Sequence, residues 1–226
     1  NWKANGAGSA NTAGSINSTV SANTTSGFSI VSWTGTGSAA TIGHGLGKVP
    51  KMIIAKQRNT ARNWVVYFLD TTIANNNVNN YLELDTTIAS TGDSGGRWGS
   101  YTNYSTTTFG VGTDNGTNQS GGTYIAYVFS DIQAYSKFGK YIGNGNNDGT
   151  FVYTGFKPAF VMVKNTAITE QWSMHDNKRN DNVIPNYARL TADNSQAEDT
   201  NTTFAKVELF SNGFKLGNSA DVINDS

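Results

Sequence analysis

The sequence predicts an all-β protein made of two tandem, internally repeated antiparallel β-sandwich units of a jelly-roll-like type. Three observations predict this fold class. Asn, Thr, Gly and Ser make up nearly half of the 226 residues, whereas the long straight side chains that favour helices are scarce. Apolar residues occur in short runs or in alternation, without a helical period over ten residues. The third observation is that a segment of the first half of the chain is similar to a segment of the second half.

The self-similarity is visible when residues 33–68 are placed over residues 141–176 without a gap, at an offset of 108. The coinciding residues include one Pro and one Trp in each segment, and they are Pro50 with Pro158, Lys56 with Lys164, and Trp64 with Trp172. Because the chain has only three Pro and five Trp, two such coincidences in one register argue for a repeated unit. The offset then falls to 106 at residues 81–84 and to 105 at residues 109–112, as small deletions in loops would produce.

This register divides the chain into three parts. Residues 1–26 are polar and are expected to form an N-terminal linker or extended arm, residues 27–131 the first sandwich and residues 132–226 the second. Residues 121–129 close the first unit, and at an offset of 105 their counterpart would begin at Ser226. We therefore expect the second unit to lack its closing strand, which either a longer natural chain or another molecule would supply.

Local patterns predict the individual strands. Residues 51–56 and 159–164 each follow a proline and are largely apolar, which predicts strands buried on both faces. Residues 124–129 are apolar on both faces and predict a central strand. Residues 204–210 alternate between apolar and charged side chains, as in a half-exposed strand. The Asn-Gly pair at 212–213 then predicts a tight hairpin turn.

The composition also narrows the class of protein. Sixteen Lys and Arg balance sixteen Asp and Glu, so the chain lacks the basic charge of a nucleic-acid-binding protein, and no nucleic-acid partner is expected. Its apolar runs are far shorter than the ~20 residues that span a bilayer, so no membrane insertion is expected. The chain has no Cys, which excludes disulfides and Cys-based zinc sites.

Few residues suggest catalysis. His44, which lies between glycines, could bind a metal or act as a base, but a structural role in a turn is favoured. His175 and Asp176 are adjacent in a predicted strand, where neighbouring side chains point to opposite faces, so they are not expected to pair. We therefore expect neither an enzyme nor a metal or other cofactor.

Three aromatic residues are the candidates for ligand binding. Trp98, Tyr101 and Tyr104 have no aromatic counterpart in the second unit and lie in a stretch rich in Gly, Ser and Thr. They are therefore predicted to be exposed rings that could stack on a sugar. The recurring Trp64 and Trp172 are instead expected in the core.

Several longer motifs resemble a known family. They are residues 2–9 (WKANGAGS), 18–31 (STVSANTTSGFSIV), 43–47 (GHGLG), 151–158 (FVYTGFKP) and 210–215 (FSNGFK). They are similar to an uncharacterised repeat domain in virion proteins of tailed phages from marine bacteria, including cyanophages. In tail or fibre proteins this domain often accompanies laminin-G-like jelly-roll domains. The resemblance covers nearly the whole chain; it implies a place on the virus particle and brings no catalytic residues.

Two functions from different classes follow from these observations. The favoured one is a structural virion protein of a tailed phage, such as a tail fibre or host-adhesion appendage, located on the tail or another surface appendage of the particle. Its expected partners are further copies of itself, preferably in a trimer, and other virion proteins. The alternatives are a carbohydrate-binding module that recognises a host surface glycan, and a decoration or fibre on the capsid.

Overall fold

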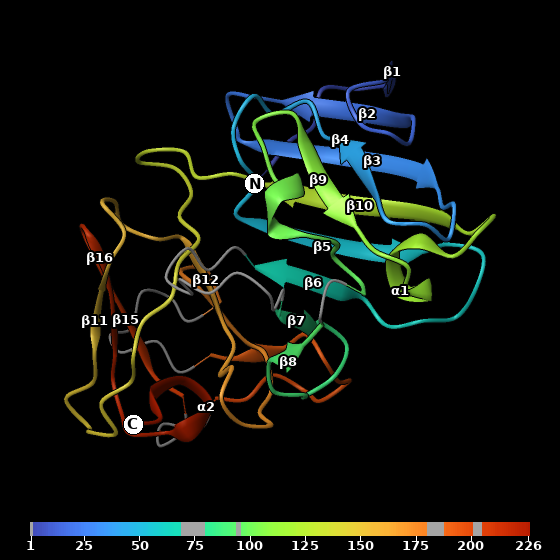
Figure 1. The fold of residues 1–226 in the computed structure, drawn as a ribbon. Coiled ribbons are helices and arrows are strands. Elements are labelled where there is room, and N and C mark those ends of the chain that lie inside the picture. The colour runs from blue at the N-terminus through green and yellow to red at the C-terminus, as the bar shows by residue number, and fades with distance from the viewer. Residues whose placement is uncertain (1, 69–79, 94–95, 180–187, 201–204) are drawn as a thin grey trace. The chain divides into compact units, whose positions relative to one another are not determined.

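The computed structural model describes the chain except for residues 1, 69–79, 94–95, 180–187 and 201–204 (Figure 1). The described residues form short β-strands that pair antiparallel in every sheet, and the two α-helices among them have four residues each. The chain folds as two compact units. Unit 1 comprises Asn1–Glu83 and Ser90–Phe138, and unit 2 comprises Leu84–Ala89 and Gly139–Ser226. The predicted all-β, antiparallel fold class is confirmed.

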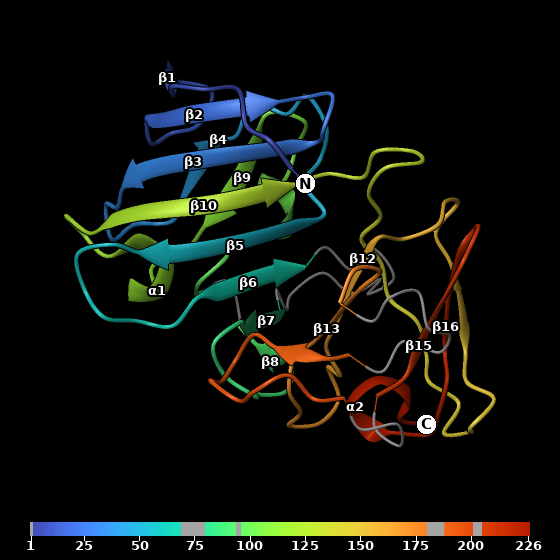
Figure 2. The ribbon, with the colours of Figure 1, turned by 180° about the vertical axis from the view of Figure 1, so that it is seen from behind.

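Unit 1 is built on an eight-stranded sheet with the strand order β1-β2-β3-β10-β5-β6-β7-β8, which Figure 2 shows from behind. Its strands are β1 (Ser9–Asn11), β2 (Ser18–Asn23), β3 (Phe28–Thr34), β5 (Met52–Gln57), β6 (Val65–Phe68), β7 (Asn80–Glu83), β8 (Thr91–Gly92) and β10 (Thr123–Phe129). β10 pairs with both β3 and β5, so the apolar segment predicted as a central strand is central. β5 is buried on both faces, also as predicted.

A second, two-stranded sheet covers one face of the large sheet in unit 1. It consists of β4 (Ala40–Gly43) and β9 (Thr108–Val111). Side chains from both sheets form one continuous core, and those of them with 5% exposure or less include Val31, Trp33, Ile42, Ile53, Phe109, Tyr124 and Val128. Two layers around one core are consistent with a β-sandwich. The short helix α1 (Asn115–Asn118) lies between β9 and β10 in the chain.

Residues 1–26 are not a linker, contrary to one of the two predictions for this segment. β1 and β2 are strands of the main sheet, and β2 pairs with β3. Ile16 also donates its backbone N–H to Thr41 O at 3.0 Å and forms a parallel bridge with Ile42. The segment is polar in composition, but Ile16 and Val20, each 8% exposed, point into the core. The segment is therefore held by the hydrogen bonds of the sheet and by these two buried side chains.

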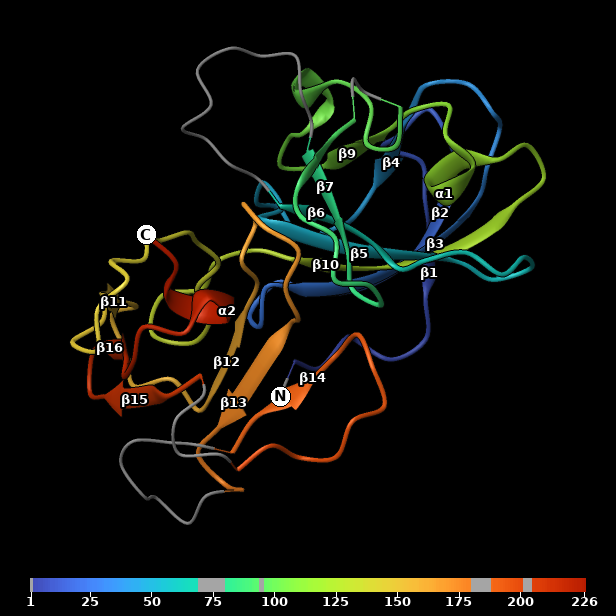
Figure 3. The same cartoon turned by 90° about the horizontal axis from the view of Figure 1, so that it is seen from below.

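Unit 2 contains two three-stranded sheets, which Figure 3 shows from below. The first has the order β11-β16-β15, with β11 (Phe151–Tyr153), β15 (Val207–Phe210) and β16 (Gly213–Leu216). The second has the order β12-β13-β14, with β12 (Phe160–Val163), β13 (Ser173–Asp176) and β14 (Leu190–Thr191). The short helix α2 (Asp221–Asn224) follows. The core of unit 2 contains Val161, Val163, Ala205, Val207, Phe214, Leu216, Val222 and Ile223.

The boundary between the units differs from the predicted one after residue 131. Unit 1 continues to Phe138, and residues 84–89, from the middle of the first predicted sandwich, belong to unit 2. Within unit 2, Thr87 O accepts hydrogen bonds from Glu170 N at 3.0 Å and from Lys164 Nζ at 3.3 Å. These contacts join residues far apart in the sequence, so composition and pattern gave no sign of them.

Two local predictions for unit 2 need correction. β15 and β16 form the predicted hairpin, but its two turn residues are Ser211 and Asn212, because Phe210 pairs with Gly213. Phe204, the predicted start of this strand, lies outside the described residues. β12 is not buried on both faces, because Phe160 is 45% exposed.

Candidate functional site

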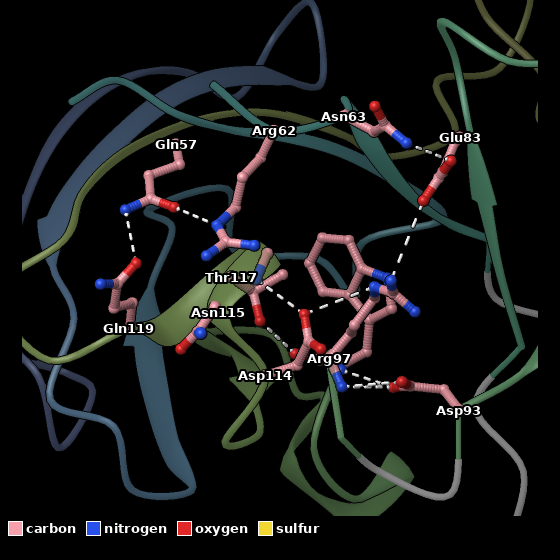
Figure 4. A network of polar contacts seen from close by, with 12 residues as sticks. Gln57, Arg62, Asn63, Glu83, Asp93, Arg97, Asp114, Asn115, Thr117 and Gln119 are labelled. Carbon is pink, nitrogen blue, oxygen red and sulfur yellow. Dashed lines mark hydrogen bonds and ion pairs between the residues drawn. The ribbon is translucent and has the colours of Figure 1, made fainter. Parts of the chain in front are cut away.

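A polar network in unit 1 surrounds Arg97 (Figure 4). The guanidinium lies 3.9 Å from the carboxylate of Glu83 and 3.4 Å from that of Asp114. It also lies over the ring of Tyr81, 3.7 Å from the centroid. Glu83 and Tyr81 belong to β7, whereas Asp114 caps α1 by accepting a hydrogen bond from Gly116 N. The arginine therefore joins a strand to a helix, and two carboxylates balance its charge.

Asp93 holds the backbone that carries this arginine. Its carboxylate accepts hydrogen bonds from Arg97 N at 2.7 Å and from Trp98 N at 2.8 Å. Burial raises the pKa of Asp93, and these bonds together with the Arg97 charge offset the rise only in part. On the other side, Thr117 Oγ1 donates to Arg97 O at 2.5 Å. The network thus acts as a clamp that fixes residues 96–98 to α1.

The structure contradicts the predicted exposure of the sugar-stacking residues. Trp98 is fully buried in the core of unit 1. Tyr104 is half-buried, stacks on Tyr67 of β6 with 4.3 Å between ring centroids, and donates its hydroxyl to Trp98 O at 3.0 Å. Tyr101 begins a short 3-10 helix, η1 (Tyr101–Asn103), and its side chain lies outside the described part of the structure. The prediction failed for Trp98 and Tyr104 because this stretch, although rich in small polar residues, packs both rings against Tyr67 of β6.

His44 is a buried structural residue, as predicted. Its Nδ1 accepts a hydrogen bond from Leu46 N at 3.2 Å, and its Nε2 lies 3.3 Å from Ser105 O. Burial lowers the pKa of His44 to about 4, because its effect exceeds the opposing effect of the contact with Ser105. The ring is therefore neutral at pH 7.

His175 is buried on one face of β13, and Asp176 turns to the other face, as the alternation of a strand predicted. Asp176 forms an ion pair with Arg179, with 2.5 Å between Oδ2 and Nε. Burial, together with the positive charges of Arg189 and Arg179, lowers the pKa of His175 to about 4. These two residues thus do not form an oriented histidine–carboxylate pair.

A fully buried asparagine holds three chain segments together in unit 1. Asn118, the last residue of α1, donates from Nδ2 to Ser38 O and to Gly112 O, both at 2.7 Å. Its Oδ1 accepts a hydrogen bond from Thr36 N at 2.9 Å. This residue was not predicted, since nothing local distinguishes one Asn in a chain rich in Asn.

Unit 2 contains a similar buried asparagine at the end of α2. Asn224 Nδ2 donates to Asn146 O at 2.9 Å, to Asn218 O at 2.8 Å and to Asn144 Oδ1 at 3.0 Å. Its Oδ1 accepts a hydrogen bond from Asn144 N at 2.9 Å. The amide therefore satisfies backbone groups of two loops, as Asn118 does in unit 1.

One face of the sheet β11-β16-β15 is aromatic and exposed. The exposed fractions are 45% for Phe151, 68% for Tyr153 and 40% for Phe210. The register places Tyr153 and Phe210 on either side of Gly213, and Phe151 opposite Lys215. A Cβ atom at Gly213 would lie 2.8 Å from Phe151 Cζ, so the glycine lets that ring lie close to the sheet. This face was not predicted, because the alternation of β15 indicates its apolar core residues and not the exposed rings.

Two other kinds of site concern metals and membranes. Among the described residues, no group of three or more His, Asp or Glu side chains is arranged to hold a metal ion. In the same part of the chain, no helix has the length and apolar character needed to cross a membrane.

The fold and these sites define an all-β protein with two units, polar clamps that use buried asparagine and arginine, and an exposed aromatic face. The chain matches, over residues 1–226, a family described as "Domain of unknown function (DUF7483)", and it belongs to this family. No curated protein and no solved structure matches the chain.

Proposed function

We propose that the protein is a structural, non-enzymatic component of a tailed-phage virion, most simply a tail fibre or host-adhesion appendage. In this proposal it assembles with further copies of itself, preferably as a trimer, and with other virion proteins. The observation that carries the proposal is the exposed apolar surface of unit 2. Among the described residues, six of the eight exposed large hydrophobic side chains lie in this unit. They are Ile142, Phe151, Tyr153, Phe160, Ile168 and Phe210.

Exposed apolar surface on this scale supports an assembly role. Contiguous exposed apolar side chains mark interaction surfaces, and Phe151, Tyr153 and Phe210 are neighbours on one face of a sheet. The neutral surface, rich in Asn, Thr, Ser and Gly, favours packing between copies without charge repulsion. The sequence resemblance to virion proteins supplies the setting.

The oligomeric state and the position on the particle test this proposal. Sedimentation of the protein at micromolar concentration should give about three times the chain mass of 24.2 kDa. Phe210→Ser should weaken the assembly, whereas the matched control Tyr135→Ser, which changes a 43% exposed ring in unit 1, should not. Immunogold labelling should mark the tail or a surface appendage of intact particles. A monomer together with unlabelled particles would refute the proposal.

A second candidate function is carbohydrate recognition by the aromatic face of unit 2. It is favoured by the three rings of Phe151, Tyr153 and Phe210 on one exposed sheet face, with Lys215 and Glu208 on the same face by register. Exposed aromatic rings stack on the apolar face of a sugar, and neighbouring charged groups can bind its hydroxyls.

A glycan array with host surface polysaccharides tests this second function. Binding should be lost in Tyr153→Ala, since this ring is the most exposed of the three. Binding should persist in Tyr135→Ala, which removes an exposed ring of unit 1. An array without any bound glycan, or equal binding by both variants, would exclude this candidate.

A further inference from the structure

We propose that the open edge of β12 in unit 2 is a strand-acceptor site, which binds an antiparallel β-strand with the side-chain pattern of β10. The inference rests on the proposed assembly role and specifies one contact through which unit 2 is completed. In unit 1, the equivalent edge is already occupied by β10.

The first step is that three strands of each unit share one register. In unit 1, Met52 pairs with Phe68 across β5 and β6, and in unit 2, Phe160 pairs with Asp176 across β12 and β13. The shift in residue number from Met52 to Phe160 equals the shift from Phe68 to Asp176. The next strands agree at the same shift, with the pairs Val66–Leu82 and Met174–Leu190. The offset of 106 predicted for residues 81–84 is therefore wrong, and Tyr187, part of that alignment, lies outside the described residues.

The second step is that the buried asparagines bind equivalent groups. Asn118 binds Ser38 O, and Asn224 binds Asn146 O; the shift from Ser38 to Asn146 is the one that relates β5 to β12. The other Asn118 bond, to Gly112 O, corresponds to the bond from Asn224 to Asn218 O. The number of positions from Asn118 to Asn224 equals the number from Gly112 to Asn218. This second shift in residue number is slightly smaller than the shift from Ser38 to Asn146.

A third contact follows the same two shifts. Trp33 Nε1 donates to Thr117 O at 3.2 Å, and Tyr141 donates its hydroxyl to Ile223 O at 2.6 Å. The donors Trp33 and Tyr141 are related by the first shift, and the acceptors are related by the second. Registers and side-chain bonds agree, so β12 is the counterpart of β5, and α2 is the counterpart of α1.

The third step compares the two edges. In unit 1, β5 pairs with β6 on one side and with β10 on the other. The pairing with β10 comprises six residue pairs, among them Ile53–Val128 and Ala55–Ala126. β10 buries Ala126, Val128 and Tyr124 completely. In unit 2, among the described residues, β12 pairs with β13 alone and forms the edge of its sheet.

The exposure of β12 agrees with a missing neighbour. Phe160 is 45% exposed, whereas its counterpart Met52 is 7% exposed. Val161 and Val163 are 7% and 6% exposed, whereas their counterparts in β5 are completely buried. A strand laid along this edge would cover these positions and pair backbone groups that an edge strand leaves to solvent.

The backbone of β12 presents specific donors to such a strand. Asn177 N donates to Ala159 O at 3.1 Å on the β13 side. Because backbone groups alternate in an antiparallel ladder, Val161 also faces β13, and Met162 faces the open edge. By the register of β10 on β5, the incoming strand should place a small residue opposite Val163 and a β-branched residue opposite Val161. Strand addition of this kind obtains affinity from main-chain bonds and specificity from alternate side chains.

The test is the binding of a labelled peptide with the β10 sequence, residues 121–130 (GGTYIAYVFS) extended by two lysines for solubility, measured by fluorescence anisotropy on the complete protein. We expect saturable binding, and protection of residues 160–163 from hydrogen exchange. Met162→Pro should weaken binding at least tenfold, because it removes an N–H at the open edge, and an edge strand tolerates proline there. Met162→Leu, which keeps the N–H, should bind as the unchanged protein does.

Several results would overturn the inference. They are the absence of saturable binding, equal binding of a scrambled peptide, or equal binding by Met162→Pro with an unchanged circular dichroism spectrum. An oligomer that Met162→Pro dissociates, without any peptide binding, would show that two β12 edges pair with each other instead. If the protein remains an oligomer in every variant and the peptide does not bind, the strand-acceptor site is wrong while the proposed assembly role stands.

Discussion

Replacing Asn118 by alanine removes three hydrogen bonds from unit 1. The groups left without this partner are Ser38 O, Gly112 O and Thr36 N, and the bonds are 2.7, 2.7 and 2.9 Å long. A typical protein hydrogen bond contributes about 1 kcal/mol, and a buried group left unsatisfied costs about 1–3 kcal/mol. Gly112 is buried, whereas Thr36 and Ser38 are exposed residues that can regain water. We therefore expect Asn118→Ala to lower the free energy of unfolding of unit 1 by about 3 kcal/mol.

Urea unfolding followed by tryptophan fluorescence measures this loss. Four of the five tryptophans lie in unit 1, and Trp172 is the one in unit 2, so a Trp172→Phe background reports on unit 1 alone. Asn118→Asp should destabilise at least as much, because a carboxylate cannot donate to Ser38 O and Gly112 O. Asn17→Ala, at an exposed position of the same unit, serves as the control and should change stability by less than about 0.5 kcal/mol.

The outcome that refutes the reasoning is a small effect. If Asn118→Ala shifts unfolding no more than Asn17→Ala, or if Asn118→Asp is neutral, the amide does not hold the loops of unit 1 together. The parallel variant Asn224→Ala should lower the stability of unit 2, which is followed through the part of the fluorescence change that disappears in the Trp172→Phe background. A loss of stability in only one of the two variants would show that only the asparagine replaced in that variant holds the loops of its unit together.

Three further predictions concern burial. Because the pKa values of His44 and His175 are about 4 in the folded protein, the unfolded chain binds more protons between pH 6.5 and 4. The free energy of unfolding should therefore be complete above pH 6.5 and fall towards pH 4, by at most about 3 kcal/mol for each histidine. His175→Met should reduce the slope of this free energy against pH in urea titrations, and an unchanged slope would contradict the assignment. Trp98→Ala should cost about 3–5 kcal/mol of stability, because the side chain is fully buried; calorimetry showing an unchanged melting temperature would contradict its place in the core. Gly213→Ala should destabilise unit 2 by about 1–3 kcal/mol, since its Cβ would lie 2.2 Å from Val152 O, and a neutral effect on urea unfolding would count against the β11–β16 pairing.

The sequence by itself determined the fold class and the strands with strong local patterns. β5 and β10 were predicted correctly because they are apolar on both faces, and a strand between two others must be apolar on both faces. The hairpin of β15 and β16 followed from alternation and an Asn-Gly pair, with an error of one residue in the turn. These features depend on neighbours within a few residues, so a single chain displays them.

The tertiary structure alone decided which residues meet. Trp98 lies in the core because its backbone is hydrogen-bonded to the side chains of Asp93 and Tyr104. Asn118 stabilises unit 1 because Ser38 and Gly112 lie close enough to accept its hydrogen bonds. These contacts join positions up to about eighty residues apart, and no local pattern encodes such a distance. The aromatic face of unit 2 likewise arises only when β11 and β15 flank β16, because strand order is set by long-range pairing and not by the residues of one strand.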